Sequence, residues 1–369
     1  MRAAAAWLHR YLGLALGALL LVSGLTGAYV VFGKQIDASL NDSLLRVQPQ
    51  AGRAPLEQVL AAARQGAPGL EAKTVFIPEQ PDVALEIWFR GTDLRAYVDP
   101  YSGALKGTRH AGDSLNGFLL DLHMHLLAGD TGEQVMGWAG LGALVLCLAG
   151  LWLWWPRRGG FGKALSVKWG ASPYRVWRDL HKLTGVALCL FMMMAAGTGA
   201  ALALHDVLTE PLLKALTGEG TRRKPPLSRP PVSPMPAASL SAMMQQAARL
   251  YPQGRITRVG LPSRPDEAVM VRMRLPGEIH QYGRTFVWFD RHDGALLRHD
   301  NALQANLATR MQNWFYPLHT GSYGGLATRW LQLFAGLAMA LLSLSGAWLF
   351  YRGWRARATA RPAPVRATL

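Results

Sequence analysis

The chain has 369 residues, of which 50% are hydrophobic, and a formal net charge of +16. It is too apolar for a typical soluble basic protein, yet its polar stretches are too long for a chain embedded throughout in a membrane. The composition therefore indicates a membrane protein with sizeable polar segments. The basic excess lies beside apolar runs, so we expect no nucleic-acid partner.

Four uncharged apolar runs are each long enough to cross a bilayer core of roughly 30 Å, which takes about 20 helical residues. They cover residues 12–32, 135–155, 183–204 and 331–351. The first follows a short basic stretch, as in a signal peptide, but its apolar run is too long and no small-residue cleavage site ends it. The sequence therefore predicts four spans, the first of them retained.

Charge predicts the orientation of these spans. The segments before residue 12, between 156 and 182, and after 351 carry fourteen Lys or Arg and one acid, Asp179. Short loops rich in Lys and Arg stay in the cytoplasm. We therefore expect a multi-pass protein with both termini cytoplasmic and two long segments that face outward, into the periplasm if the organism has two membranes. Its partners then include membrane lipid.

The two halves of the chain resemble each other. Residues 7–29 align without gaps to 179–201, and residues 121–155 align to 317–351. Between them, each half has an amphipathic helix followed by alternating strand-like runs. We therefore expect a membrane α-helical fold with α+β exported domains, in which two parallel repeats are related by a pseudo-two-fold axis along the membrane normal.

The repeats predict the domain boundaries. They are a first transmembrane helix at 1–33, an exported domain at 34–112, an interfacial segment at 113–134, a second transmembrane helix at 135–155, a cytoplasmic loop at 156–178, a third transmembrane helix at 179–205, a linker and second exported domain at 206–310, a second interfacial segment at 311–326, a fourth transmembrane helix at 327–351 and a cytoplasmic tail at 352–369. The Pro-rich basic stretch 221–236 is expected to be the extended linker.

Four histidines occupy equivalent positions in the repeats. His9 aligns with His181 at the cytoplasmic ends of the first and third spans, and His123 aligns with His319 before the second and fourth. A pseudo-two-fold axis brings equivalent side chains to the same depth on opposite sides of one central ligand. Two axial imidazoles are what a planar haem needs. Two such sites, one in each leaflet, would form an electron path across the membrane.

Two other histidines are reserve ligands. His125 lies two residues after His123, on the other side of the short helix expected at 118–127 and beside Asp121, and His205 ends the third span without a repeat counterpart. The remaining histidines lie in the exported domains and are expected to face solvent: His110, His280, His292 and His299.

Other interpretations of these residues stay open. A single histidine near a helix end is commonly an interfacial polar residue, and inheritance by both repeats would preserve the match without a ligand. Gly13 and Gly185, one turn after His9 and His181, leave room for a porphyrin edge or simply allow close helix packing. Zinc fits less well, because no carboxylate or thiolate completes a tetrahedral site near His123.

No nucleotide, flavin or hydrolase motif is present. The two cysteines, Cys147 and Cys189, lie inside spans, and no Cys-x-x-Cys-His is available for covalent haem attachment. Any electrons would therefore come from a partner protein or from quinol.

Several stretches resemble the PepSY-associated transmembrane family, and within it the FoxB-type inner-membrane ferric-siderophore reductases. They are "WLHRYLGL", "DLHMHLL", "PLHTGSYGG", "GAWLFYRG" and "YVDPYSGAL". The resemblance covers nearly the whole chain. It implies two PepSY-like periplasmic domains and two b-type haems, with haem iron bound through His9, His181, His123 and His319, or with His125 or His205 replacing one of them.

The resemblance also implies an oxidoreductase activity. A ferric siderophore would be reduced in the periplasm and release its iron as Fe(II), with the electron donor a quinol or a cytoplasmic reductase. Outer-sphere electron transfer needs no acid, base or nucleophile, so no catalytic residue is expected beyond the haems. One rival is a membrane-anchored PepSY module that regulates or scaffolds another protein. Another is a transporter, which is disfavoured because no span is charged or visibly broken.

Overall fold

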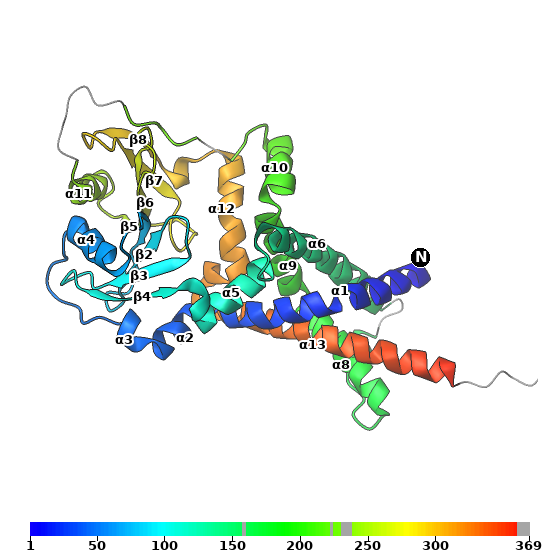
Figure 1. Cartoon of the computed structure of the whole chain (residues 1–369). Helices are drawn as coiled ribbons and strands as arrows, with labels where there is room; N and C mark the ends of the chain where they lie inside the picture. Colours follow the sequence, from blue (N-terminus) through cyan, green and yellow to red (C-terminus); the bar gives the residue numbers. More distant parts are fainter. Residues whose placement is uncertain (157–159, 222–223, 230–237, 360–369) are drawn as a thin grey trace, which may run out of the picture.

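Long apolar helices extend from one side of a sheet domain (Figure 1). The structure is a computed structural model and describes residues 1–156, 160–221, 224–229 and 238–359. Among these residues, three helices are long and apolar enough to cross a membrane. They are α1 (Arg2–Val30), α6 (Gly129–Trp154) and α13 (Gly325–Ala358). α13 covers the whole of the fourth predicted span, and α1 and α6 cover the first and second as far as Val30 and Trp154.

The third predicted span is bent. Helices α8 (Pro173–Ala187) and α9 (Cys189–Ala203) are apolar enough only as a pair, and they meet at an angle of 64° beside Leu188. No proline or charge marks the bend in the sequence, so the expectation of an unbroken span was wrong here. The described residues therefore contain three candidate spans, or four if the bent pair counts as one.

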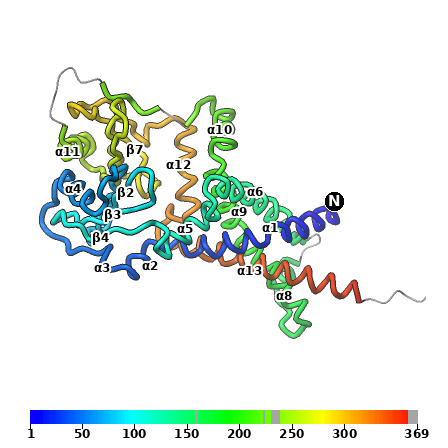
Figure 2. The backbone as a smooth tube through the Cα atoms, viewed as in Figure 1, coloured from blue at the N-terminus to red at the C-terminus, as the bar shows by residue number. Residues whose placement is uncertain are grey.

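Small residues bring these helices close together. A Cβ atom added to Gly24 of α1 would come within 2.6 Å of the Gly336 carbonyl oxygen in α13. One added to Gly140 of α6 would lie 3.0 Å from the Ala196 carbonyl oxygen in α9. Such contacts supply the van der Waals packing that holds helices together in lipid. Figures 1 and 2 show the first of these pairs, α1 alongside α13.

An eight-stranded antiparallel sheet combines both halves of the chain. Its order is β4-β3-β2-β1-β5-β6-β7-β8, so the halves meet at the β1–β5 pair, where Val75 lies opposite Val259. The strands are β1 (Ala72–Phe76), β2 (Leu85–Phe89), β3 (Leu94–Val98), β4 (Leu105–His110), β5 (Arg255–Gly260), β6 (Val269–Arg274), β7 (Thr285–Phe289) and β8 (Leu296–Asp300). The two predicted exported segments thus share one sheet, and the boundaries assigned to them stay predictions.

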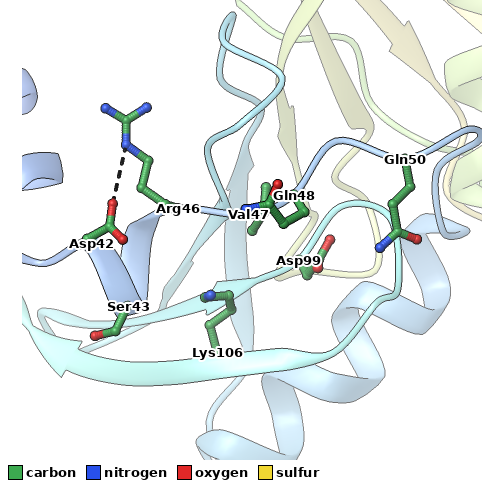
Figure 3. A pocket seen from close by; sticks show the side chains of 8 residues that line it. All are labelled: Asp42, Ser43, Arg46, Val47, Gln48, Gln50, Asp99 and Lys106. Carbon is green, nitrogen blue, oxygen red and sulfur yellow. Dashed lines mark ion pairs between the residues drawn. The ribbon is translucent and has the colours of Figure 1, made fainter.

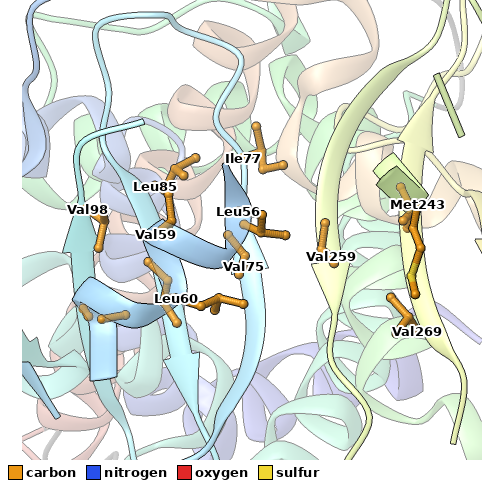
Figure 4. Packing of buried hydrophobic residues seen from close by; sticks show 14 of the residues in the cluster. Leu56, Val59, Leu60, Val75, Ile77, Leu85, Val98, Met243, Val259 and Val269 are labelled. Carbon is orange, nitrogen blue, oxygen red and sulfur yellow. The ribbon is translucent and has the colours of Figure 1, made fainter. Parts of the chain in front are cut away.

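One face of the sheet carries the main hydrophobic core. Helices α4 (Leu56–Gly66) and α11 (Leu240–Leu250), one from each half, cover this face (Figures 1 and 4). Alternate strand residues point toward them, and Val75, Val259 and Val271 are fully buried. Burying a side chain of this size contributes roughly 1.5–3 kcal/mol. The core therefore holds the two halves together as well as covering the sheet.

Hydrogen bonds also join the two covering helices. The Glu57 carboxylate at the start of α4 accepts hydrogen bonds from the Ser239 hydroxyl, at 2.9 Å, and from the Ser241 backbone N–H, at 3.0 Å. In return, the Ser241 hydroxyl accepts a hydrogen bond from the Leu56 backbone N–H at 3.0 Å. Each helix thus helps to satisfy the unpaired N-terminal groups of the other.

Short helices connect the sheet to the spans. Helix α2 (Gly33–Leu40) follows α1 and is fixed to β4 by a buried ion pair between Asp37 and Arg109. Two helices lead toward the later spans, α5 (Leu115–His125) and α12 (Leu307–Thr320). The other short elements are α3 (Asp42–Leu45), α7 (Phe161–Ala164), a π-helix (His205–Thr209), α10 (Glu210–Thr217) and 3-10 helices at Ala111–Asp113, Ala302–Gln304 and Ser322–Gly324.

The expected linker 221–236 lies largely outside the described residues. Its described stretch, 224–229, runs beside the sheet domain, where Leu227 forms an isolated antiparallel bridge with Glu267.

Candidate functional site: two histidine pairs

The four repeat-matched histidines lie in two pairs. The rings of His123 (α5) and His319 (α12) have centroids 6.1 Å apart, with 35° between their planes. The rings of His9 (α1) and His181 (α8) have centroids 6.4 Å apart and are nearly perpendicular, at 86°. Each pair therefore joins one side chain from each half of the chain, at the alignment-matched positions.

The pairs lie near opposite ends of α1. His9 is close to the start of this helix, and His123 packs on Gly27 near its end. The two positions are eighteen residues apart, which corresponds to about 27 Å along a helix axis. This separation is close to the thickness of a bilayer core, roughly 30 Å.

Neighbouring acceptors determine the tautomer of the first pair. His123 Nδ1 lies 3.1 Å from the Thr26 hydroxyl, which itself donates to the Val22 carbonyl oxygen at 2.7 Å. The hydroxyl hydrogen is thus already committed, so His123 Nδ1–H must be the donor. His319 Nδ1 lies 3.0 Å from the Ala195 carbonyl oxygen, which can only accept. Both rings therefore carry their proton on Nδ1 and leave the Nε2 lone pair free.

The second pair has the same tautomer through different partners. His9 Nδ1 donates to the Leu146 carbonyl oxygen at 3.1 Å. His181 Nδ1 lies 2.8 Å from the Ser345 hydroxyl, which donates to the Leu341 carbonyl oxygen at 2.7 Å and so accepts from the ring. Among the described residues, no polar group is hydrogen-bonded to Nε2 of any of the four rings.

Each ring also rests on a glycine of a neighbouring helix. A Cβ atom on Gly27 or Gly199 would lie 2.8 Å from Cε1 of His123 or His319, respectively, which is too close for an ordinary contact. The matching distances are 3.1 Å from Gly150 to His9 and 3.5 Å from Gly346 to His181. Gly27 aligns with Gly199 in the repeats, and Gly150 aligns with Gly346. Because none of the four has a side chain, the rings can lie against the helix backbone at these positions.

The geometry of both pairs suits two axial ligands of one metal atom. A histidine nitrogen lies about 2 Å from a metal it binds, so two imidazoles on opposite sides of an iron place their centroids roughly 6 Å apart. Metal-binding histidines also donate their other N–H to a carbonyl or hydroxyl, as all four do here. In the part of the chain that the structure describes, no group of three or more His, Cys, Asp or Glu is gathered as for a metal ion. Two imidazoles plus the four nitrogens of a porphyrin would complete the coordination of iron.

The reserve histidines have other partners. His125 Nδ1 is 2.7 Å from Asp121 Oδ1, as its position on the helix predicted. His205 has both ring nitrogens engaged, with Nδ1 2.8 Å from Asp206 Oδ1 and Nε2 2.5 Å from the side-chain nitrogen of Gln312. Neither forms part of a histidine pair.

Gly13 and Gly185 lie against leucines of neighbouring helices: a Cβ atom on each would lie 3.7 Å from Leu146 and 3.8 Å from Leu342, respectively, which agrees with the close-packing interpretation. One other histidine differs from the sequence-based expectation. His280 does not face solvent as expected: it is buried, with 8% exposure. It stacks on a tyrosine of α12, a contact that its polar loop sequence does not reveal. His110 and His299 are exposed and His292 is half-buried.

A polar depression of about 400 Å³ lies elsewhere, between α3, the loop after it and β4 (Figure 3). Asp42, Arg46, Asp99 and Lys106 line it, and the first two form an ion pair at 3.9 Å. Its charges are mixed, and none of the four paired histidines lines it.

Comparison with known families identifies one that matches nearly the whole chain. The model of the PepSY-associated TM region matches residues 6–352. The chain belongs to this family, and it is a membrane protein. No curated protein matches the chain.

Proposed function

We propose that the protein is an inner-membrane di-haem reductase that passes electrons across the membrane and reduces ferric siderophore in the periplasm, releasing Fe(II). The observation that supports it best is the state of the four imidazoles. Each has Nδ1–H donated to a fixed acceptor, each leaves Nε2 free, and the ring centroids of the two pairs lie 6.4 Å and 6.1 Å apart.

His123 and His319 would hold the periplasmic haem, and His9 and His181 the cytoplasmic one. Haem iron at each pair would supply one-electron chemistry by alternating between ferric and ferrous states. The surrounding residues orient the ligands: Thr26 holds the His123 ring in one tautomer, and Ser345 does the same for His181. Hydrogen bonds of this kind tune both affinity and reduction potential.

The overall reaction balances with a quinol or a cytoplasmic reductase as donor. A quinol that is oxidised to quinone gives up two electrons and two protons, enough to reduce two ferric ions to Fe(II). Each ferric siderophore accepts one electron and then loses its iron, because the ferrous ion is held more weakly by hard oxygen ligands. No side chain has to transfer a proton to the substrate.

The proposed topology places both termini in the cytoplasm and the sheet domain in the periplasm. Four spans in two parallel repeats would result if the bent pair α8–α9 crosses the membrane once. Supporting contacts recur at matched positions: Gly24 on Gly336, and Ala196 on Gly140. Bent helices also occur in transporters. Here the bend lies between His181, which belongs to one histidine pair, and Gly199, which contacts His319 of the other pair.

Reoxidation of the reduced protein tests this function. The purified protein is reduced with a limiting amount of dithionite under argon. It is then mixed with a ferric siderophore, a carboxylate or catecholate complex in one sample and a hydroxamate complex in another, together with an Fe(II)-specific chromogenic chelator. We expect the ferrous haem absorption to decay in step with chelated Fe(II), one iron per electron. Aluminium siderophore, which accepts no electron, is the control. A haem protein that is not reoxidised faster by the ferric complex than by the control is an electron carrier for another acceptor. A protein without haem supports a regulatory or scaffolding module.

A further inference from the structure

The sheet face opposite α4 and α11 carries a row of aromatic and charged side chains. Cross-strand register places Phe76 opposite Arg258, Arg258 opposite Arg272, and Arg272 opposite Phe286. The Arg258 guanidinium lies 4.1 Å from the Phe76 ring centroid, and that of Arg272 lies 5.7 Å from the Phe286 centroid. The aromatic rings thus flank two adjacent arginines at the centre of the sheet.

Two like charges directly opposite each other on neighbouring strands destabilise a sheet. In the part of the chain that the structure describes, no carboxylate lies within ion-pair distance of Arg258 or Arg272. Glu86, on the same face, is paired with Arg95 at 2.7 Å. Glu278 instead accepts hydrogen bonds from the Thr285 hydroxyl, at 2.6 Å, and from backbone N–H groups. The Arg272 guanidinium donates to the Gly283 carbonyl oxygen, at 2.8 Å from Nε, so the positive charges of the two arginines are not neutralised by a carboxylate.

Two more cations converge on the same place. Lys34 of α2 is exposed, and its Nζ lies 4.9 Å from the Tyr282 ring centroid. Arg284 donates from Nε to the Asn313 side-chain oxygen at 3.2 Å and lies over the Phe286 ring. Burial lowers the pKa of Arg272 to about 9, and the nearby charges of Arg284 and Arg258 add to this effect. The closeness of these positive charges is thus electrostatically unfavourable when no anion is bound.

This basic face lies next to one histidine pair. Tyr316 of α12 stacks on His280 with centroids 4.9 Å apart and planes 18° apart, and His280 Nδ1 is within 3.5 Å of the Arg272 guanidinium. Tyr316 and His319 are three residues apart on α12, so they lie on the same side of that helix. A molecule bound against the basic face would therefore lie close to the His123–His319 pair.

We propose that the face formed by Lys34, Arg258, Arg284 and Tyr316, with the buried Arg272 beneath it, binds an anionic ferric chelate, one whose iron is held by carboxylates or catecholates. Guanidinium groups pair with such oxygens in a bidentate manner, and the flanking rings pack against the apolar or planar parts of the ligand. A bound anion would offset the repulsion between the arginines. The redox role of this site rests on the proposed function, but anion binding does not.

Binding of redox-inert gallium chelates tests the proposal. Calorimetric titration of the full-length protein in detergent uses anionic Ga(III) citrate and, for comparison, neutral Ga(III) tris-acetohydroxamate. We expect the citrate complex to bind the wild type and to bind Arg258→Gln or Lys34→Gln at least tenfold more weakly. The matched control is Arg249→Gln, which removes an exposed charge from α11 on the other side of the sheet and should leave the affinity unchanged.

Two results would overturn the proposal. One is citrate-complex affinity that is equal in wild type, Arg258→Gln and Lys34→Gln. The other is Arg258-dependent binding of short-chain phosphatidylglycerol without binding of gallium citrate, which would make the face a lipid site. Arg258→Gln should fold at least as stably as wild type, because it removes one of two opposed like charges. If its melting temperature falls, the exposed Lys34→Gln decides the question.

The test is independent of electron transfer, because gallium(III) is not reduced. A chain that binds gallium citrate but holds no haem contradicts the proposed function alone. A di-haem protein that reduces anionic ferric complexes equally well with and without Arg258 contradicts this inference alone.

Discussion

The two histidine pairs share one plan but have different neighbours. In the His123–His319 pair, each Nδ1 lies beside a threonine of the helix on which its ring rests, Thr26 at 3.1 Å and Thr198 at 3.4 Å. In the His9–His181 pair, His9 donates to a backbone carbonyl, whereas His181 donates to the Ser345 hydroxyl. The position matched to Ser345 in the first half is Ala149.

This difference shows which features of a site both halves retain and which have diverged. The glycine under each ring and the free Nε2 occur at all four histidines, as ligation would require. The partner of Nδ1 varies, and that partner sets how much electron density the imidazole offers to a metal. We therefore expect two haems with similar ligation and different reduction potentials.

Removing one ligand should have the largest effect. His123→Ala is expected to halve the haem content and to abolish reduction of ferric siderophore, because the electron path would end at the other haem. His125→Ala, two residues away, should keep both haems and most activity. Pyridine haemochrome assays and Fe(II) trapping measure the two effects. Equal haem loss in both variants would show that the assignment of His123 as the ligand is wrong.

Filling the space beneath a ring should have the next largest effect. Gly27→Val places atoms where His123 Cε1 now lies 2.8 Å from an added Cβ, so the ring must move. We expect haem retention at this pair to fall by about 10- to 100-fold, as for other losses of ligand positioning. Gly17→Val is the matched control on the same helix, since nothing lies within 4 Å of its added Cβ. Similar retention in both variants would show that the glycine does not position the ligand.

Changing one Nδ1 partner should have a smaller effect, which is confined to one histidine pair. Ser345→Ala removes the acceptor for His181, so we expect about tenfold weaker haem binding and a shifted potential at the His9–His181 pair alone. Spectroelectrochemical titration resolves the two transitions. The control Ser343→Ala removes a hydroxyl that donates to the Met339 carbonyl oxygen at 2.9 Å and, among the described residues, to no other acceptor. A shift of both transitions, or of neither, would contradict the assignment.

The smallest effect concerns the junction of the two halves in the sheet domain. Partial burial raises the pKa of Glu57, but hydrogen bonds from Ser241 and Ser239 outweigh it and bring the pKa from 4.5 to about 2. A carboxyl with a lowered folded-state pKa stabilises the fold above pH 4.5, and this contribution is lost as the pH falls toward 2.

We therefore expect Glu57→Gln to lower stability at pH 7 by about 1 kcal/mol, a modest value because the side chain is exposed. The difference from wild type should shrink on acidification. Thermal unfolding at several pH values measures it, with Glu71→Gln as an exposed control. A difference that stays constant from pH 7 to pH 3 would rule out the ionised carboxylate as the cause.

Much of the candidate site could be predicted because the two halves align. The alignment matched His9 with His181 and His123 with His319, and also Thr26 with Thr198 and Gly27 with Gly199. It did not show that the threonine and glycine contact the histidine, because that depends on how α5 and α1 are rotated against each other. Thr26 lies beside Gly27 in sequence, and only the helix packing brings both to His123.

Other features leave no local signal in the sequence. Pairing of β1 with β5 joins strands about 180 residues apart, and nothing in either strand indicates its partner. The bend at Leu188 occurs without proline. The basic face was also missed, since Arg258 and Arg272 resemble ordinary exposed strand residues until register places them side by side.

The most direct test of the central claim is the haem content of the purified full-length protein, expressed with ample haem. A dithionite-reduced minus oxidised spectrum with haem quantified per chain should show low-spin b-type bands at close to two haems per chain. A colourless protein would contradict the account, and the paired histidines would then be an inherited structural feature of the repeats.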